Sequence, residues 1–129
     1  MSSSTRDRGA AAVEFALIAP ILMMMVLGIV EFGSLYKTNI TMTNAAMTAA
    51  RSFAAGDSST SVAARTSTAT TVARSASERP SATVAISCTT GACASGDNVT
   101  VTVTYREPLL TGLFGANRVL SGKGTARCG

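Results

Sequence analysis

The start of the chain is a long apolar block. Residues 10–30 contain one charged side chain, Glu14, among aliphatic, methionine and phenylalanine residues. At about 1.5 Å per residue, a helix of this length spans roughly 31 Å, close to the hydrocarbon thickness of about 30 Å. The pattern therefore predicts a transmembrane helix over residues 10–30.

The charges beside this block predict its direction. Arg6 and Arg8 precede it, whereas Glu31 follows it and the next cation is Lys37. Because cations favour the cytoplasmic side, we expect a single-pass protein with its N-terminus in the cytoplasm and its C-terminal part outside.

A cleaved secretory signal also begins with cations and an apolar run. This run is longer than a typical signal core, contains Glu14 and Pro20, and has no small-x-small cleavage site soon after it. These features favour a retained anchor.

Helical spacing continues beyond the apolar block. The 4,3,4,3,4 spacing predicts one helical face that consists of Tyr36, Ile40, Thr43, Met47, Ala50 and Ala54. Gly56 then supplies a stop, and Asp57 or Ser58 can cap a second helix over residues 59–77. Pro80 ends that helix. Its expected face consists of Val62, Thr66, Ala69, Ala73 and Ala76.

After Pro80 the period changes to two. The sequence VTVTVTY, residues 99–105, places valines and Tyr105 on one strand face and threonines on the other. Residues 82–88 and 118–127 are two further strand candidates. The predicted fold class is α+β, with a long N-terminal helix that extends outward, a second helix and an antiparallel sheet of about three strands. The apolar loop 107–115 is expected to fold over the sheet edge.

Composition argues against catalysis. The chain has no His, scattered acidic residues and no phosphate-binding glycine motif, so we expect no enzyme, cofactor or small-molecule substrate. The net charge of +4 is spread along the chain without interleaved aromatic residues, so no nucleic-acid partner is predicted. Small side chains also predict a thin core that depends on a disulfide, the anchor or neighbouring subunits.

The cysteines all follow the apolar block, where an oxidising compartment permits disulfides. Cys88 and Cys93 flank the short turn TTGA and are the favoured pair. Cys128 is then free, although it is also an alternative partner for Cys88 or for another subunit. No metal site is expected, since no His is available and Cys128 would have to be the third ligand.

Glu14 needs an explanation, because a charge at the membrane centre costs about 2.5–3.5 kcal/mol on insertion scales. One hypothesis is that Glu14 reaches the membrane surface. The other is a cut between Gly9 and Ala10, which creates an amine on Ala10 one helical turn from the carboxylate. The two groups can then neutralise each other within one subunit or between neighbours.

This arrangement resembles type IV pilins, and a longer set of motifs resembles the TadE-like family of minor pseudopilins of the tight-adherence (Tad, or Flp) pilus system. The family pattern has an R-G-x-x-x-V-E-F start, a proline in mid-span, a G-I-x-E-F-G exit and a later N-A-A...A-A-R segment. In this chain it corresponds to Arg8, Gly9, Val13, Glu14, Phe15, Pro20, Gly28, Ile29, Glu31, Phe32, Gly33, Asn44, Ala45, Ala46, Ala50 and Arg51.

The resemblance implies cleavage after Gly9 by a prepilin peptidase and a structural role in pilus assembly and adhesion. It implies a pilin-like fold in the bacterial cytoplasmic membrane, with incorporation into a surface pilus as a further step. The partners would be the lipid bilayer, the peptidase, other Tad pilins and pseudopilins, and the assembly platform. Pro20 is expected to kink the helix. The alternative is an uncleaved signal anchor that holds an extracytoplasmic binding or envelope protein.

These expectations divide the chain into four parts. They are a basic leader peptide over residues 1–9, the transmembrane helix over 10–30, an extracytoplasmic helical segment over 31–79, and a small antiparallel β-sheet region over 80–129.

Overall fold

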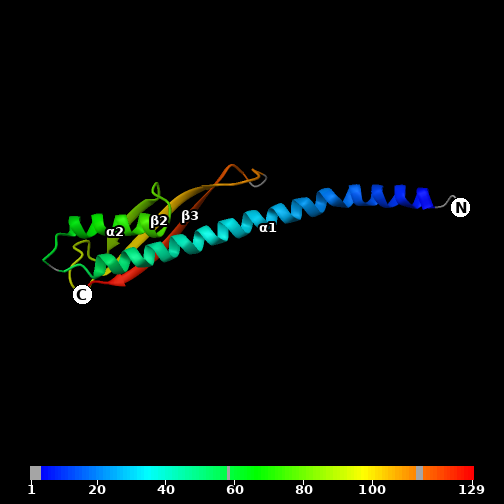
Figure 1. The fold of residues 1–129 in the computed structure, drawn as a ribbon. Helices are drawn as coiled ribbons and strands as arrows, with labels where there is room; N and C mark the ends of the chain where they lie inside the picture. Colours follow the sequence, from blue (N-terminus) through cyan, green and yellow to red (C-terminus); the bar gives the residue numbers. More distant parts are fainter. Residues whose placement is uncertain (1–3, 58, 113–114) are drawn as a thin grey trace. The chain divides into compact units, whose positions relative to one another are not determined.

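The computed structural model describes residues 4–57, 59–112 and 115–129, with side chains from residue 9 onward. The element order is α1 (Ser4–Ala54), α2 (Val62–Ala76), β1 (Thr83–Cys88), β2 (Asn98–Pro108) and β3 (Asn117–Arg127) (Figure 1). This order confirms the predicted α+β class. Leu113 and Phe114 of the predicted apolar loop lie outside the described residues.

The chain forms two compact units, residues 1–34 and residues 35–129. α1 contributes to both units, since it is continuous over 51 residues. Its start at Ser4 lies before the predicted start at Ala10.

The three strands of the second unit form one antiparallel sheet in the order β1-β2-β3. Val103 of β2 lies opposite Val84 of β1 and Gly122 of β3. The predicted alternation is confirmed, because Val99, Val101 and Val103 are fully buried and the intervening threonines are not.

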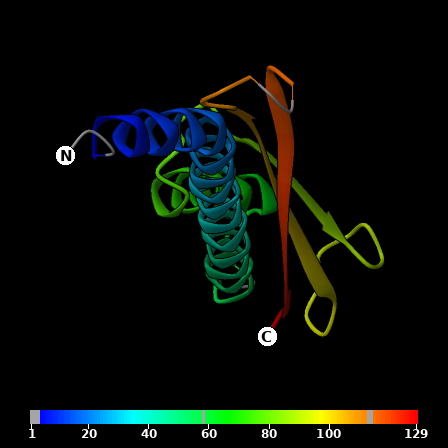
Figure 2. The ribbon, with the colours of Figure 1, turned by 90° about the vertical axis from the view of Figure 1, so that its right-hand side faces the viewer.

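Both helices of this unit pack on the same face of the sheet (Figure 2). The core on that face combines Met42, Ala46, Ala49 and Phe53 of α1 with Ala69 and Ala73 of α2 and the three valines of β2. Most of these side chains are small, as the composition predicted, so each buries little apolar area.

The predicted face of α1 was right at Ala50, which is fully buried, and wrong at several other positions. Tyr36 is 68% exposed and Met47 is 45% exposed, whereas Met42 and Phe53 are fully buried. Helical spacing fits both sets of residues equally well, and the alanines beside Met42 and Phe53 allow the closer approach to the sheet.

α2 begins later than predicted. Ser61 is its N-cap, and the Ser61 hydroxyl accepts a hydrogen bond of 3.3 Å from the Ala64 N–H. The predicted cap Asp57 instead accepts from the Ser59 N–H at 3.3 Å, and the other predicted cap, Ser58, lies outside the described residues. Ala69 and Ala73 are buried as predicted, but Val62 and Ala76 are exposed.

A charged residue, Arg65, is buried on the inner face of α2. Its guanidinium lies 4.4 Å from the centroid of the Phe53 ring and donates a 2.9 Å hydrogen bond to the carbonyl oxygen of Cys93. A cation over an aromatic ring is attracted by the ring quadrupole. Arg65 therefore connects α2 with the end of α1 and with the loop after β1.

α1 and β3 approach so closely that backbone touches backbone. A Cβ atom at Gly122 would lie 2.3 Å from the Met42 carbonyl carbon, and one at Gly124 would lie 2.3 Å from the Met47 nitrogen. Real side chains do not approach backbone atoms this closely, so only glycine fits at these two positions.

Cys88 and Cys93 form a disulfide with a Cα–Cα distance of 5.1 Å, which is the pairing that the sequence favoured. Cys128 is a free, buried thiol. Its backbone N–H donates to the Asp97 carbonyl at 2.8 Å, and its own carbonyl accepts from the Gly96 N–H at 2.9 Å. These bonds hold the end of the chain beside the turn before β2.

We predict that Gly124→Ala destabilises the folded chain by about 1–3 kcal/mol, since overpacking forces the helix and strand apart. The measurement is urea unfolding of the full chain in uncharged detergent. Lys123→Ala is the matched control, because Lys123 is exposed and should change stability by less than about 0.5 kcal/mol. Equal stability of the two variants would contradict the close approach.

We predict that the double variant Cys88→Ala, Cys93→Ala loses about 2 kcal/mol of stability, the chain-entropy value for a short closed loop. Thermal unfolding of the full chain under oxidising conditions measures the change, with Ser87→Ala as the control. An unchanged melting temperature would mean that the disulfide contributes nothing to this fold.

Candidate membrane and processing site

The first unit presents apolar side chains on all sides of α1. Among the described residues, α1 is the helix that is long and apolar enough to cross a membrane. The exposed large apolar side chains of its first unit are Val13, Phe15, Leu17, Ile18, Ile21, Leu22, Met23, Met24, Met25, Val26, Leu27, Ile29, Val30 and Phe32. A helix that is apolar on all sides fits a single-pass membrane anchor.

The predicted processing site lies near the start of this helix. Gly9 and Ala10 are both helical and exposed. A Cβ atom at Gly9 would have no neighbour within 4 Å. Because helix ends fray and glycine lowers helix stability by about 1 kcal/mol relative to alanine, this end of α1 can open at low cost.

Glu14 is exposed on the same helix and makes no hydrogen bond or ion pair within the described part of the chain. It lies one turn beyond Ala10, a rise of about 6 Å. While the leader is attached, the Ala10 nitrogen is an uncharged amide. The predicted charge pair therefore requires the cut.

Pro20 lies inside α1, and the helix continues past it. Proline has no N–H, so the carbonyl of Ala16 loses its usual helical donor. In lipid such a carbonyl is best satisfied by a neighbouring helix. The kink at Pro20 stays a prediction.

The structure brings Gly9, Ala10 and Glu14 within two turns of one helix, and Pro20 follows about 9 Å beyond Glu14. Cys88 and Cys93 belong to the other unit and take no part in this site.

Sequence reasoning used Glu31 as a flanking charge and as one position of the family pattern, and did not predict its burial. The structure buries it, with 2% of its surface exposed. The available signal was its place in the G-I-x-E-F-G motif, where the chain departs from the purely apolar block.

The hollows described in the second unit are shallow and open. The described residues contain no group of three or more His, Cys, Asp or Glu side chains that could hold a metal ion.

These features define an α+β protein with a single N-terminal helix suited to anchoring in a membrane. The family model described as TadE-like protein matches residues 9–51. This match confirms the resemblance, and it begins at Gly9 and ends at Arg51. The match covers 43 of the 129 residues, all of them in α1, and indicates a Tad pilus-associated protein. No curated protein and no solved structure matches the chain.

Proposed function

We propose that this chain is a minor pilin or pseudopilin of a Tad pilus. A prepilin peptidase cuts between Gly9 and Ala10. The helix over residues 10–30 then holds the subunit in the bacterial cytoplasmic membrane until pilus assembly extracts it. The observation that carries the proposal is the family match starting at Gly9, together with the exposed Glu14, which makes no hydrogen bond or ion pair within the described residues of a helix suited to lipid.

The cut converts an unfavourable charge into an assembly contact. A carboxylate alone in lipid carries a cost of several kcal/mol, which an amine at the same depth can offset. In a bundle of staggered helices, the amine on Ala10 of one subunit lies close to Glu14 of its neighbour. The pair then favours subunits in register over isolated ones.

The rest of the subunit suits the same role. The proposed orientation places the leader in the cytoplasm and residues 31–129 outside, where the Cys88–Cys93 disulfide is stable. The exposed apolar side chains of α1 face lipid before assembly and other pilin helices afterwards. The proposed partners are the peptidase, other Tad pilins and pseudopilins, and the assembly platform.

We predict that co-expression with a prepilin peptidase removes residues 1–9, and that Gly9→Val prevents this removal because a branched side chain blocks the peptidase. Intact mass and N-terminal sequencing measure the product. Gly28→Val on the same helix is the matched control, since a Cβ atom added at Gly28 would also have no neighbour within 4 Å. A pilus that assembles from chains with an intact leader would refute the proposal.

We predict that Glu14→Ala leaves membrane insertion intact or improved, because it removes a charge from lipid. Pilus assembly should fall by at least about tenfold, the effect of losing about 1.4 kcal/mol per contact. Carbonate extraction measures insertion, and sheared pili measure assembly. Glu78→Ala, which removes an exposed carboxylate outside the N-terminal helix, is the control. Normal assembly of the Glu14→Ala chain would indicate a plain signal anchor.

A further inference from the structure

The sheet has one face that neither helix covers. We call it the outer face and define it by the positions that alternate with the buried ones: Thr83, Ala85, Ser87, Asn98, Thr100, Thr102, Thr104, Arg106, Val119, Ser121, Lys123, Thr125 and Arg127. Seven of these positions carry hydroxyl groups and three carry cations.

The register arranges these side chains in rows across the strands. Thr104 lies between Thr83 and Ser121, and Thr102 lies between Ala85 and Lys123. Adjacent residues in such a row are about 5 Å apart. A ligand that lies across the outer face therefore meets several hydroxyl groups at once.

The outer face has cations but no carboxylate. Residues 35–129 contain nine cations and four acidic residues, and every acid lies elsewhere. Glu107 faces the other side of the sheet and pairs with Arg79 at 2.9 Å. Asp97 lies in the turn before β2 and accepts hydrogen bonds from Thr90 and the Ala94 N–H. The positive charge of the outer face is thus uncompensated.

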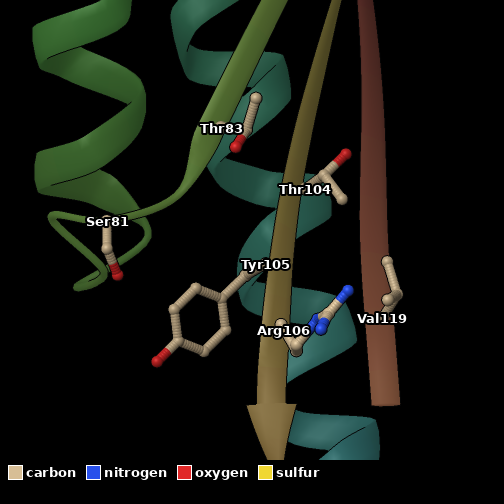
Figure 3. A pocket seen from close by; sticks show the side chains of 6 residues that line it. All are labelled: Ser81, Thr83, Thr104, Tyr105, Arg106 and Val119. Carbon is tan, nitrogen blue, oxygen red and sulfur yellow. The ribbon is translucent and has the colours of Figure 1, made fainter. Parts of the chain in front are cut away.

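Two shallow hollows lie near opposite ends of the outer face. The first is lined by Thr83, Thr104, Arg106 and Val119, together with Ser81 and Tyr105 (Figure 3). Arg106 extends from β2 toward β3 in this view. The second is lined by Asn98, Thr100, Thr125, Ala126 and Arg127. Each hollow combines one arginine with two threonines.

Lys123 lies between the two hollows. Arg106 and the residue opposite Arg127 are eight positions apart along β2, or about 27 Å. The three cations therefore form a sparse line along the strands, with hydroxyl groups between them.

We propose that the outer face binds an acidic polysaccharide that carries carboxylates. Arginine binds a carboxylate through paired N–H donors, and threonine hydroxyls can both donate to and accept from sugar hydroxyls. A polymer with many hydroxyls and spaced charges complements the composition of this surface. The proposal rests on the extracytoplasmic position of residues 31–129 in the function proposed above.

Other occupants fit less well. Duplex DNA carries one charge per about 1.7 Å, much denser than three cations over this length, and single strands are bound by stacking on aromatic side chains. The outer face positions hold no aromatic residue, and Tyr105 is the one aromatic side chain that lines either of these two hollows, too few for stacking along a strand. A second copy would bring like charges together. A protein partner would need an apolar centre, whereas Val119 is the one large apolar residue of this face.

The test uses the full chain in uncharged detergent micelles and measures its binding to immobilised alginate, with neutral dextran as the comparison polymer. We expect binding to alginate alone, weakened by salt. The variant Arg106→Gln, Lys123→Gln, Arg127→Gln should bind at least about tenfold more weakly, equivalent to about 1.4 kcal/mol.

The matched control is Lys37→Gln, Arg51→Gln, Arg118→Gln, which changes the net charge equally at exposed positions away from the outer face. It should keep its affinity within about twofold if local contacts rather than total charge carry binding. A second variant, Thr100→Val, Thr104→Val, removes two hydroxyl groups at nearly constant volume and should also weaken binding to alginate. It keeps the proposal testable if the outer-face triple variant does not fold.

The proposal would be overturned if the two triple variants lost alginate affinity equally, or if the unmodified chain bound dextran as tightly as alginate. Tighter binding to duplex DNA than to alginate of the same total charge would also overturn it. The measurement needs neither cleavage nor assembly. A chain that binds alginate but keeps its leader would refute only the pilus function, and a processed chain that ignores alginate would refute only this inference.

Discussion

The contact between the α1 backbone and the two glycines of β3 is the interaction on which the folded unit of residues 35–129 depends. Alanines line much of the buried face of α1, so hydrophobic burial per residue is small. Dispersion forces compensate only when the surfaces touch, because they fall steeply with distance. Gly122 and Gly124 remove the side chains that would separate helix from strand. Arg65 then connects α2 with the loop after β1 through its hydrogen bond to Cys93, and the Cys88–Cys93 disulfide closes that loop.

The periodicity of the sequence was sufficient to predict the helices and strands, but it was not sufficient to predict how they pack. Alternation identified the buried valines of β2, since the sheet has one covered face and a period of two leaves no other choice. On α1, the same helical spacing fits the exposed set with Tyr36 and the buried set with Met42. The choice between these sets depends on how closely the helix approaches β3, and no local pattern records that distance.

The charged residues also divide into those that the sequence pattern could identify and those that it could not. The Gly9 to Glu14 spacing was readable because the charge stands out in an apolar block, and the family match begins at the same glycine. The burial of Arg65 was not readable, since an arginine among serines and threonines resembles an ordinary surface residue. Its environment comes from Phe53 and Cys93, which are distant in sequence and meet it only in the folded unit.

Arg65 is buried in its own subunit, whereas Glu14 is exposed on a helix that fits a membrane anchor, and this difference bears on function. The Phe53 ring and the Cys93 carbonyl oxygen contact the Arg65 guanidinium inside its own subunit, although its Nε makes no hydrogen bond within the described residues. Glu14 makes no such contact in the described part of its chain. A buried charge that finds contacts within its own subunit favours one fold, whereas a charge without such contacts on a lipid-facing helix is stabilised by another group at the same depth. If cleavage supplies that group on a neighbouring subunit, the subunit requires neighbours, and assembly relieves a cost that the isolated helix retains.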